Sequence, residues 1–403
     1  MHANAALRTW PADIMRRNVT ARQRWLRMSR ANYRWNTCSW ISTTPPEKDF
    51  MDKPIAITIG DPAGIGPEII AKVFRDAPDL ARSCFVAGDI GTMRRAAQCL
   101  ASTGELVMPV ALLDSPIQAL NAPPRCIPVL QVDTPAALVP LGRVSAAGGT
   151  MAARCVLWAA NAALRGEVAA LVTAPLNKEA LAAAGPPHSA YPGHTEMLQA
   201  VAAAYLGKPL VDLPVRMMLA NDELRTVLVS IHVSLSAAIQ AVTFDNVLQT
   251  LRITHDALGS VLGHAPRIGV AGLNPHAGEG GLFGTEEVDT IAPAIAVARA
   301  LGLDVSGPLA PDTVFMRARS HAGQRGDFDV VVAMYHDQGL IPVKYMGLDK
   351  GVNVTLGLPL VRTSPDHGTA FDIAGTGRAD ASSLMEAIRM ARQMASGSRA
   401  VHC

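Results

Sequence analysis

Three short apolar runs along the chain each deliver a histidine at or just past their end. They are Val330–Met334 before His336, Thr226–Ile231 before His232 and Ile268–Pro275 before His276. Short runs of small and β-branched residues are typical of strands buried on both faces of a parallel sheet, and ligands bind beyond the carboxyl ends of such strands. The sequence therefore predicts an α/β fold whose strand ends carry three imidazoles.

The three histidines suggest a metal site. Histidine is the commonest neutral metal ligand, and three imidazoles with an open position form a Lewis-acid centre. Each could equally be a structural residue, because gaps of 44 and 60 residues match no compact zinc motif. Their shared position after an apolar strand, in a chain with only 11 histidines, favours the metal site.

Composition limits the class of protein. At 403 residues, 49% hydrophobic and 17% charged, the chain is long enough for two globular domains. Its longest apolar run, Cys155–Leu176, is broken by Arg165 and Glu167, so no membrane span is predicted. The six cysteines are scattered and form no CxxC pair, which favours reduced thiols in a cytoplasmic protein.

Residues 1–50 differ from the rest of the chain. They carry a net charge of +6 and four of the five tryptophans, whereas residues 51–403 carry −4 and have no basic footprint for nucleic acid. The segment could be an arginine-rich targeting arm or an extension without a fold of its own. A strand pattern, Ile55–Ile59, begins directly after Met51, so a disordered extension is the preferred interpretation.

A glycine-rich loop, Gly60–Glu68, follows this first strand. Pro67 suits the first position of a helix, and Glu68 would complement the positive helix end. Neither a P-loop nor the GxGxxG motif of Rossmann folds is present. The loop predicts a close approach of backbone to a ligand without identifying it.

Other stretches place anion-binding groups at element ends. Tyr191–Glu196 puts His194 and Thr195 at a predicted helix N-terminus, whose free N–H groups favour an anion, although Thr195 could simply cap that helix. Arginine can bind phosphate or carboxylate bidentately. Two basic residues and one amide, which suit a phosphate or a carboxylate, follow the third histidine: Lys344, Arg362 and Asn353.

The motifs GDPAGIGPE, YPGHTE, GLNPHAGEGG, AMYHDQG, GVNVTLGLP and RTSPDHGTAFDIAG together resemble the 4-hydroxythreonine-4-phosphate dehydrogenase family of vitamin B6 synthesis, over Met51–Ala395. The first and last are also similar to segments of isopropylmalate and isocitrate dehydrogenases. The resemblance implies their two-domain α/β/α architecture, not a Rossmann fold. Residues 51–185 plus 337–403 would form a discontinuous NAD-side domain, and residues 186–336 the metal and dimer side.

The resemblance also implies the site residues. The divalent-metal ligands fall on His232, His276 and His336, with Zn²⁺ expected and Mg²⁺ or Co²⁺ as alternatives. The third histidine is expected from the neighbouring subunit, which implies a homodimer with composite sites. Substrate-binding positions fall on His194, Thr195, Lys344, Asn353 and Arg362. NAD-binding positions fall on His367, Gly368 and Asp372.

The implied reaction is NAD-dependent oxidation of the C3 hydroxyl of 4-phosphooxy-L-threonine. The metal lowers the pKa of that hydroxyl, and the oxidised product then decarboxylates to 3-amino-2-oxopropyl phosphate. Lys344 and Asp312 are the candidates for proton handling, although Asp312 could instead orient a metal ligand or only cap a helix. The substrate phosphate would supply remote binding energy.

Other functions stay open. Asn177, in the segment APLNKE, replaces a histidine common in the pyridoxine branch, and the segment looks more like a sibling branch acting on 4-phospho-D-threonate or 4-phospho-D-erythronate. A more distant relative oxidises a terephthalate dihydrodiol, but Arg362 and His194 favour a phosphorylated substrate. A non-catalytic, metal-stabilised phosphate-binding dimer is the alternative from another class, although such a binder would not need the loop Asp366–Gly375.

Overall fold

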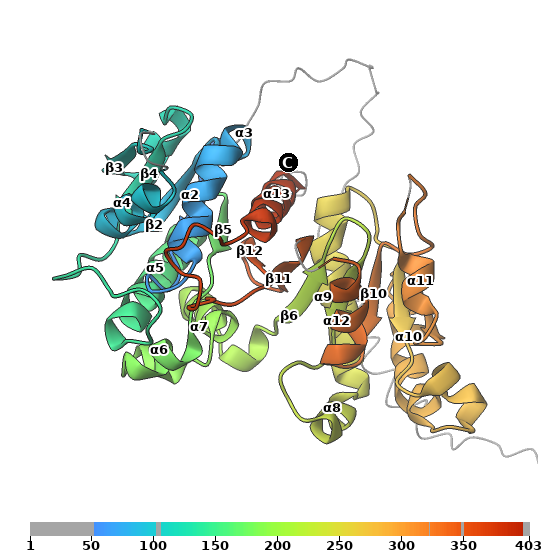
Figure 1. Cartoon of the computed structure of the whole chain (residues 1–403). Helices are drawn as coiled ribbons and strands as arrows, with labels where there is room; N and C mark the ends of the chain where they lie inside the picture. Colours follow the sequence, from blue (N-terminus) through green and yellow to red (C-terminus); the bar gives the residue numbers. More distant parts are fainter. Residues whose placement is uncertain (1–51, 102–105, 322, 348–349, 398–403) are drawn as a thin grey trace, which may run out of the picture. The chain divides into compact units, whose positions relative to one another are not determined.

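The computed structural model describes residues 52–101, 106–321, 323–347 and 350–397, so the expected extension over residues 1–50 lies outside the described residues. The strands are β1 (Ile55–Thr58), β2 (Cys84–Gly88), β3 (Val110–Leu113), β4 (Ile127–Gln131), β5 (Ala170–Thr173), β6 (Arg216–Ala220), β7 (Arg225–Leu228), β8 (Ile268–Ala271), β9 (Val305–Leu309), β10 (Val330–Ala333), β11 (Val352–Leu356) and β12 (Arg362–Pro365). They form one sheet in the order β3-β4-β2-β1-β5-β12-β11-β6-β7-β10-β8-β9 (Figure 1).

Strand direction changes in the middle of this sheet. The strands from β3 to β12 in that order pair in parallel, and so do β7, β10, β8 and β9. Between them, β12, β11, β6 and β7 pair antiparallel. The three strands predicted to precede histidines are the parallel neighbours β7, β10 and β8. The α/β class is confirmed, whereas the boundaries of the two expected domains stay a prediction.

Helices cover both faces of the sheet (Figure 1). One face is covered by α2 (Gly66–Asp76), α4 (Ile90–Cys99), α9 (Phe244–Leu262), α10 (Ala292–Ala300) and α13 (Ser382–Gly397). The other face is covered by α5 (Ala146–Leu164), α6 (Lys178–Ala183), α7 (His194–Leu206), α11 (Val314–Ala318) and α12 (His336–Tyr345). Shorter elements are α3 (Pro78–Ala81), α8 (Leu235–Ala241), η1 (Pro116–Asn121), η2 (His188–Ala190), η3 (Leu210–Asp212), η4 (Pro275–Gly281) and η5 (Glu287–Ile291). None of the described helices combines the length and the hydropathy needed to cross a membrane.

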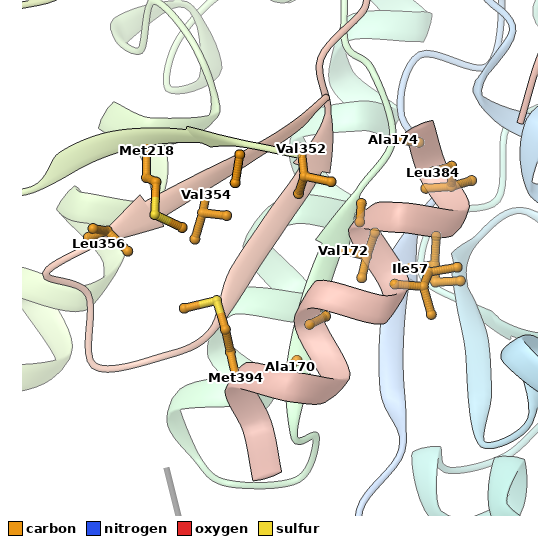
Figure 2. Close-up of a cluster of buried hydrophobic side chains, with 14 of the residues drawn as sticks. Ile57, Ala170, Val172, Ala174, Met218, Val352, Val354, Leu356, Leu384 and Met394 are labelled. Carbon is orange, nitrogen blue, oxygen red and sulfur yellow. The ribbon is translucent and has the colours of Figure 1, made fainter. Parts of the chain in front are cut away.

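Alternate residues of each strand face the two helical layers. Figure 2 shows Val172 of β5 and Val354 of β11 gathered with Leu384 and Met394 of α13. The residue next to Val172, Leu171, packs instead against the layer that contains α5 and α7. Each such branched side chain contributes about 1.5–3 kcal/mol through burial, so the alternation holds both layers on the sheet.

Helices α5 and α6 touch through their backbones at Gly149. A Cβ atom at this position would lie 1.9 Å from the carbonyl oxygen of Ala180. Gly259, in the equally long helix α9, is different, because the nearest atom to a Cβ there is Pro266 Cδ at 3.9 Å. Only the first glycine is therefore required by packing.

We expect Gly149→Ala to destabilise the fold by about 3 kcal/mol, because a backbone carbonyl cannot move aside as a side chain can. Gly259→Ala is the matched control and should stabilise by about 0.5–1 kcal/mol, since alanine restricts the unfolded chain and favours a helix. Chemical denaturation of both variants measures the difference. Equal stability of the two variants would contradict this account of the contact between α5 and α6.

Candidate active site

A cleft of about 440 Å³ opens at the carboxyl ends of β5, β7 and β12. Four of the five expected substrate-binding residues line it: His194, Thr195, Asn353 and Arg362. Sequence reasoning did not single out three further polar residues of this lining: Thr173, Lys178 and Glu196. The position after a strand end is the signal that could have identified the first two.

Arg362 is the buried cation of this cleft. The residue is 3% exposed. Its Nε and Nη2 donate to Thr173 Oγ1 at 3.1 and 2.8 Å, and its Nη1 donates to Thr355 Oγ1 at 3.0 Å. Burial lowers its pKa to about 10, opposed by the negative charge of Glu196. The structure shows no ion pair for Arg362 within the described residues, so an anion bound from solution would supply its missing counter-charge.

His194 is the first residue of α7, and Gly193 is the N-cap without any side-chain capping bond. The alternative that Thr195 caps this helix is therefore wrong. His194 Nε2 is buried and has no hydrogen-bond partner in the described chain. Burial, together with the positive charges of Arg362 and Lys178, holds the pKa of His194 well below its usual value. The imidazole is thus neutral at physiological pH, beside a helix end that favours anions.

The two proton-handling candidates lie apart. Lys344, in the last turn of α12, forms an ion pair with Asp366 at 2.5 Å, and only Asp366 lines the cleft. Asp312 is exposed in a second cleft of about 750 Å³, next to His276. Asp312 does not cap α11, whose N-cap is Thr313. One chain therefore does not bring Lys344 and Asp312 together.

The three predicted metal ligands are also divided. The rings of His232 and His336 lie 5.4 Å apart between centroids. Two imidazoles on one tetrahedral Zn²⁺ would have centroids about 5 Å apart, so this pair fits neighbouring positions on a metal. His336 Nδ1 is 2.7 Å from Asp337 Oδ1, a carboxylate that can orient a ligand.

His276 lies in the second cleft instead. Across residues 52–397, leaving out the few positions that are not described, no three histidine, cysteine or acidic side chains stand close enough to hold a metal. The resemblance implied that His232 and His276 come from one subunit and His336 from its neighbour. In this structure His232 and His336 of one chain are paired, and His276 lies apart from them. The assignment of these histidines as ligands stays a prediction.

The two glycine-bearing loops pack on one another near the cleft. Ile65 N donates to Thr369 O at 2.9 Å, and a Cβ on Gly64 would lie 2.8 Å from the same oxygen. Glu68 lies in the first turn of α2 and accepts from the backbone N–H groups of Gly375 and Ala379, so it also holds the second loop in place.

The predicted cofactor-binding residues belong to this second loop. Two of them, His367 and Gly368, line the cleft. The third, Asp372, is exposed and does not line it.

Asn177 has a structural role in the described chain. Its Oδ1 accepts from the backbone N–H of Ala180 at 2.8 Å, which caps α6. Asn177 does not line the cleft, whereas the next residue, Lys178, does. Asn177 therefore shapes the helix that carries Lys178 and is not part of the cleft wall.

Comparison with known proteins identifies the family of the chain. Residues 80–391 match the family model described as Pyridoxal phosphate biosynthetic protein PdxA. The chain is 52% identical over 348 residues to a 4-hydroxythreonine-4-phosphate dehydrogenase of Beijerinckia indica, which covers 86% of this chain and 96% of that relative.

It is 44% identical over 347 residues to a D-threonate 4-phosphate dehydrogenase of Pectobacterium atrosepticum, covering 86% and 100% of the two chains. The crystal structure of a Klebsiella pneumoniae 4-hydroxythreonine-4-phosphate dehydrogenase matches with a TM-score of 0.72 at 41% identity, covering 85% of this chain and 99% of that one.

Arg362→Met should weaken binding of inorganic phosphate about 10- to 100-fold, because the buried charge and its hydrogen bonds are lost. The rise in melting temperature caused by added phosphate measures this binding independently of turnover. Arg216→Met is the control, since Arg216 is part-buried and, like Arg362, donates to neutral side chains, Thr250 and Gln249, but does not line the cleft. An unchanged phosphate effect in Arg362→Met would refute the anion site.

Asp61, in the first glycine loop, should make stability depend on pH. Burial raises its pKa to about 6, and its Oδ2 has no partner. The folded state therefore binds more protons than the unfolded state, whose carboxyl titrates at about pH 4. The contribution of Asp61 to the free energy of unfolding should therefore fall as pH rises from about 4 to 6 and then stay level, whereas the lowered pKa of His194 contributes with the opposite sign.

Asp61→Asn should remove this slope and stabilise the protein by about 1–3 kcal/mol at pH 7. Asp89→Asn is the control, for which the expected change in the free energy of unfolding has the opposite sign. Asp89 accepts hydrogen bonds from Thr92 and Gln131, which lower its pKa against the opposing effect of burial, so its loss should destabilise at pH 7. Denaturant unfolding of wild type and both variants across pH 4 to 7 tests this, and a stability difference between wild type and Asp61→Asn that does not change with pH would contradict the assignment.

Proposed function

Because the chain belongs to the PdxA family, we propose that it oxidises the C3 hydroxyl of 4-phosphooxy-L-threonine with NAD⁺ and that the product decarboxylates to 3-amino-2-oxopropyl phosphate, in the synthesis of vitamin B6. The observation that carries this proposal is the buried guanidinium of Arg362, whose charge is not balanced by any described carboxylate at ion-pair distance. A phosphate monoester carries the double negative charge that such a group binds best.

The phosphate end of the substrate would be fixed by three kinds of donor. Arg362 is held in place by Thr173 and Thr355, so its fork is preorganised before the ligand arrives. The N-terminus of α7 adds free backbone N–H groups, and the unpartnered Nε2 of neutral His194 adds one hydrogen-bonding atom. Binding energy gathered there orients the distant C3 carbon for reaction.

The reacting end would lie near His232 and His336, which would hold a divalent cation, Zn²⁺ by preference for imidazole and Mg²⁺ or Co²⁺ as alternatives. When bound, such a cation lowers the pKa of the C3 hydroxyl, and NAD⁺ accepts the hydride. His367 and Gly368 border the same cleft and would contact the nicotinamide cofactor. Lys344, paired with Asp366 at the cleft wall, is better placed to move a proton than Asp312.

A homodimer would complete this site. Large apolar side chains are exposed around the second cleft, where Met316 is 74% exposed and Ile341 63% exposed. Apolar exposure on this scale favours an interface, and a second copy of the chain is the partner that would cover it. His276 and Asp312 share this second cleft, so the interface would also bring them to a composite active site.

We place the reaction in the cytoplasm. The described cysteines Cys84, Cys99, Cys126 and Cys155 are all free, which suits a reducing compartment.

The second candidate is the oxidation of 4-phospho-D-threonate or 4-phospho-D-erythronate, supported by the named D-threonate 4-phosphate dehydrogenases among the relatives. These substrates carry a hydroxyl at C2 where the threonine derivative carries an amine. Arg362 and His194 bind the phosphate, which all of these substrates share, and therefore do not separate the two functions. The choice rests on groups near C2.

NADH formation distinguishes the candidates. The purified protein should oxidise 4-phosphooxy-L-threonine only after metal is restored to chelator-treated enzyme, with Zn²⁺, Mg²⁺ and no metal compared. A preference for 4-phospho-D-threonate or 4-phospho-D-erythronate would assign the chain to the second function instead. A metal-loaded dimer that binds phosphate but forms no NADH from any of these substrates would refute the dehydrogenase proposal. The alternative of a non-catalytic phosphate-binding dimer would then be preferred.

A further inference from the structure

Lys178 is a second cation of the cleft without a partner. It is the first residue of α6, directly after the capping residue Asn177, and its side chain lines the cleft. Within the described chain its ammonium makes no hydrogen bond or ion pair, whereas Lys344 is already neutralised by Asp366 at 2.5 Å. A bound ligand is therefore the natural source of a counter-charge.

Lys178 shares its cleft with both groups of predicted site residues. The same lining contains Arg362 and His194, proposed to bind the phosphate, and His232, proposed to hold the metal. The Lys178 side chain also approaches the start of α7, because a Cβ on Gly193 would lie 3.8 Å from Lys178 Cε.

Two cations in one cleft match a ligand with two separate anionic groups. The proposed substrates carry a phosphate on C4 and a carboxylate at C1. With the phosphate bound by Arg362 and His194, a second cation without an ion-pair partner borders the same cleft and is available for the carboxylate. A ligand with a phosphate alone would leave the charge of Lys178 without a partner.

Glu196 is the competitor within the chain. It lies across Gly193 from Lys178, because a Cβ on Gly193 would be 3.4 Å from Glu196 Oε2 and 3.8 Å from Lys178 Cε. The two charged groups are nevertheless not within ion-pair distance in the described structure. Any test of Lys178 must therefore separate a ligand contact from an internal ion pair that forms when the side chains move.

We propose that Lys178 binds the substrate carboxylate and so sets the direction of the C1–C2 bond that breaks on decarboxylation. This role rests on the proposed function, since it requires a substrate with phosphate and carboxylate at opposite ends. Lys178 would then contact the ligand directly. Asn177, which caps α6, would position Lys178 for that contact.

Two probes isolate the carboxylate. 4-Phosphooxybutanoate and butyl phosphate share a phosphate and a four-carbon chain, but only the first has a carboxylate, and neither has a hydroxyl to oxidise. Their dissociation constants are measured by ligand-induced melting shifts and by inhibition of NADH formation. Wild type should bind 4-phosphooxybutanoate more tightly. Lys178→Met should weaken this probe about 10-fold and butyl phosphate by less than about twofold.

Further variants separate a direct carboxylate contact from a general field effect and from an internal ion pair. Lys178→Arg should retain the preference for the carboxylate probe, and Lys208→Met, which removes an exposed lysine outside the cleft, should leave both constants unchanged. Equal loss of both probes in Lys178→Met would overturn the proposal in favour of a field effect. An identical loss in Glu196→Gln would overturn it in favour of an internal ion pair.

The proposed function can fail separately. If wild type forms no NADH yet still prefers the carboxylate probe through Lys178, the reaction assignment is wrong and the carboxylate contact stands. Normal turnover in a wild type that shows no preference between the probes would overturn the contact alone.

Discussion

The site depends on one buried charge. Arg362 begins β12, which runs parallel to β5 and antiparallel to β11, and its guanidinium is bonded to Thr173 at the end of β5 and to Thr355 in β11. Three strands therefore fix one cation where the sheet changes direction. Burying an ionised guanidinium against neutral hydroxyls is unfavourable without an anion, and the proposed binding of the substrate phosphate would relieve this cost.

Local patterns predicted the strands but not how they are joined. The apolar runs before His232, His276 and His336 became β7, β8 and β10, because a strand buried on both faces leaves a clear signature in sequence. The antiparallel insertion of β11 and β6 has no such signature. Pairing direction is decided by contacts between residues far apart in the chain, and those contacts place Arg362 in the cleft.

The same limit applies to the site residues. His194, Asn353 and Arg362 were expected from motifs and do line one cleft, whereas Asp312, a candidate for proton handling, lines another. Lys178 was passed over because an isolated lysine after a strand resembles any solvated surface residue. Its meaning comes from neighbours in α7 and after β7 that only the fold brings near it.

The glycine loops show how distant sequence becomes one structure. Glu68 was interpreted as a partner of its own helix, yet it accepts hydrogen bonds from Gly375 and Ala379, about 300 residues later. Nearby, Asp61 Oδ1 accepts a hydrogen bond from the Ala63 N–H but Oδ2 has no partner, so burial of this carboxylate is unfavourable for the same loop. A fold under selection for stability alone would replace such a group, so its presence beside the proposed cofactor loop is consistent with a functional demand on that backbone.

The divided histidines have a chemical consequence for the proposed homodimer. Two imidazoles at 5.4 Å would offer a metal only half of a tetrahedral set, and two ligands bind far more weakly than three or four. The third histidine stands in a cleft bordered by exposed apolar side chains, so association that buries those side chains would also complete the ligand set. Hydrophobic burial and metal binding would then reinforce one another, and a monomer would be both less stable and less able to hold its metal than the dimer.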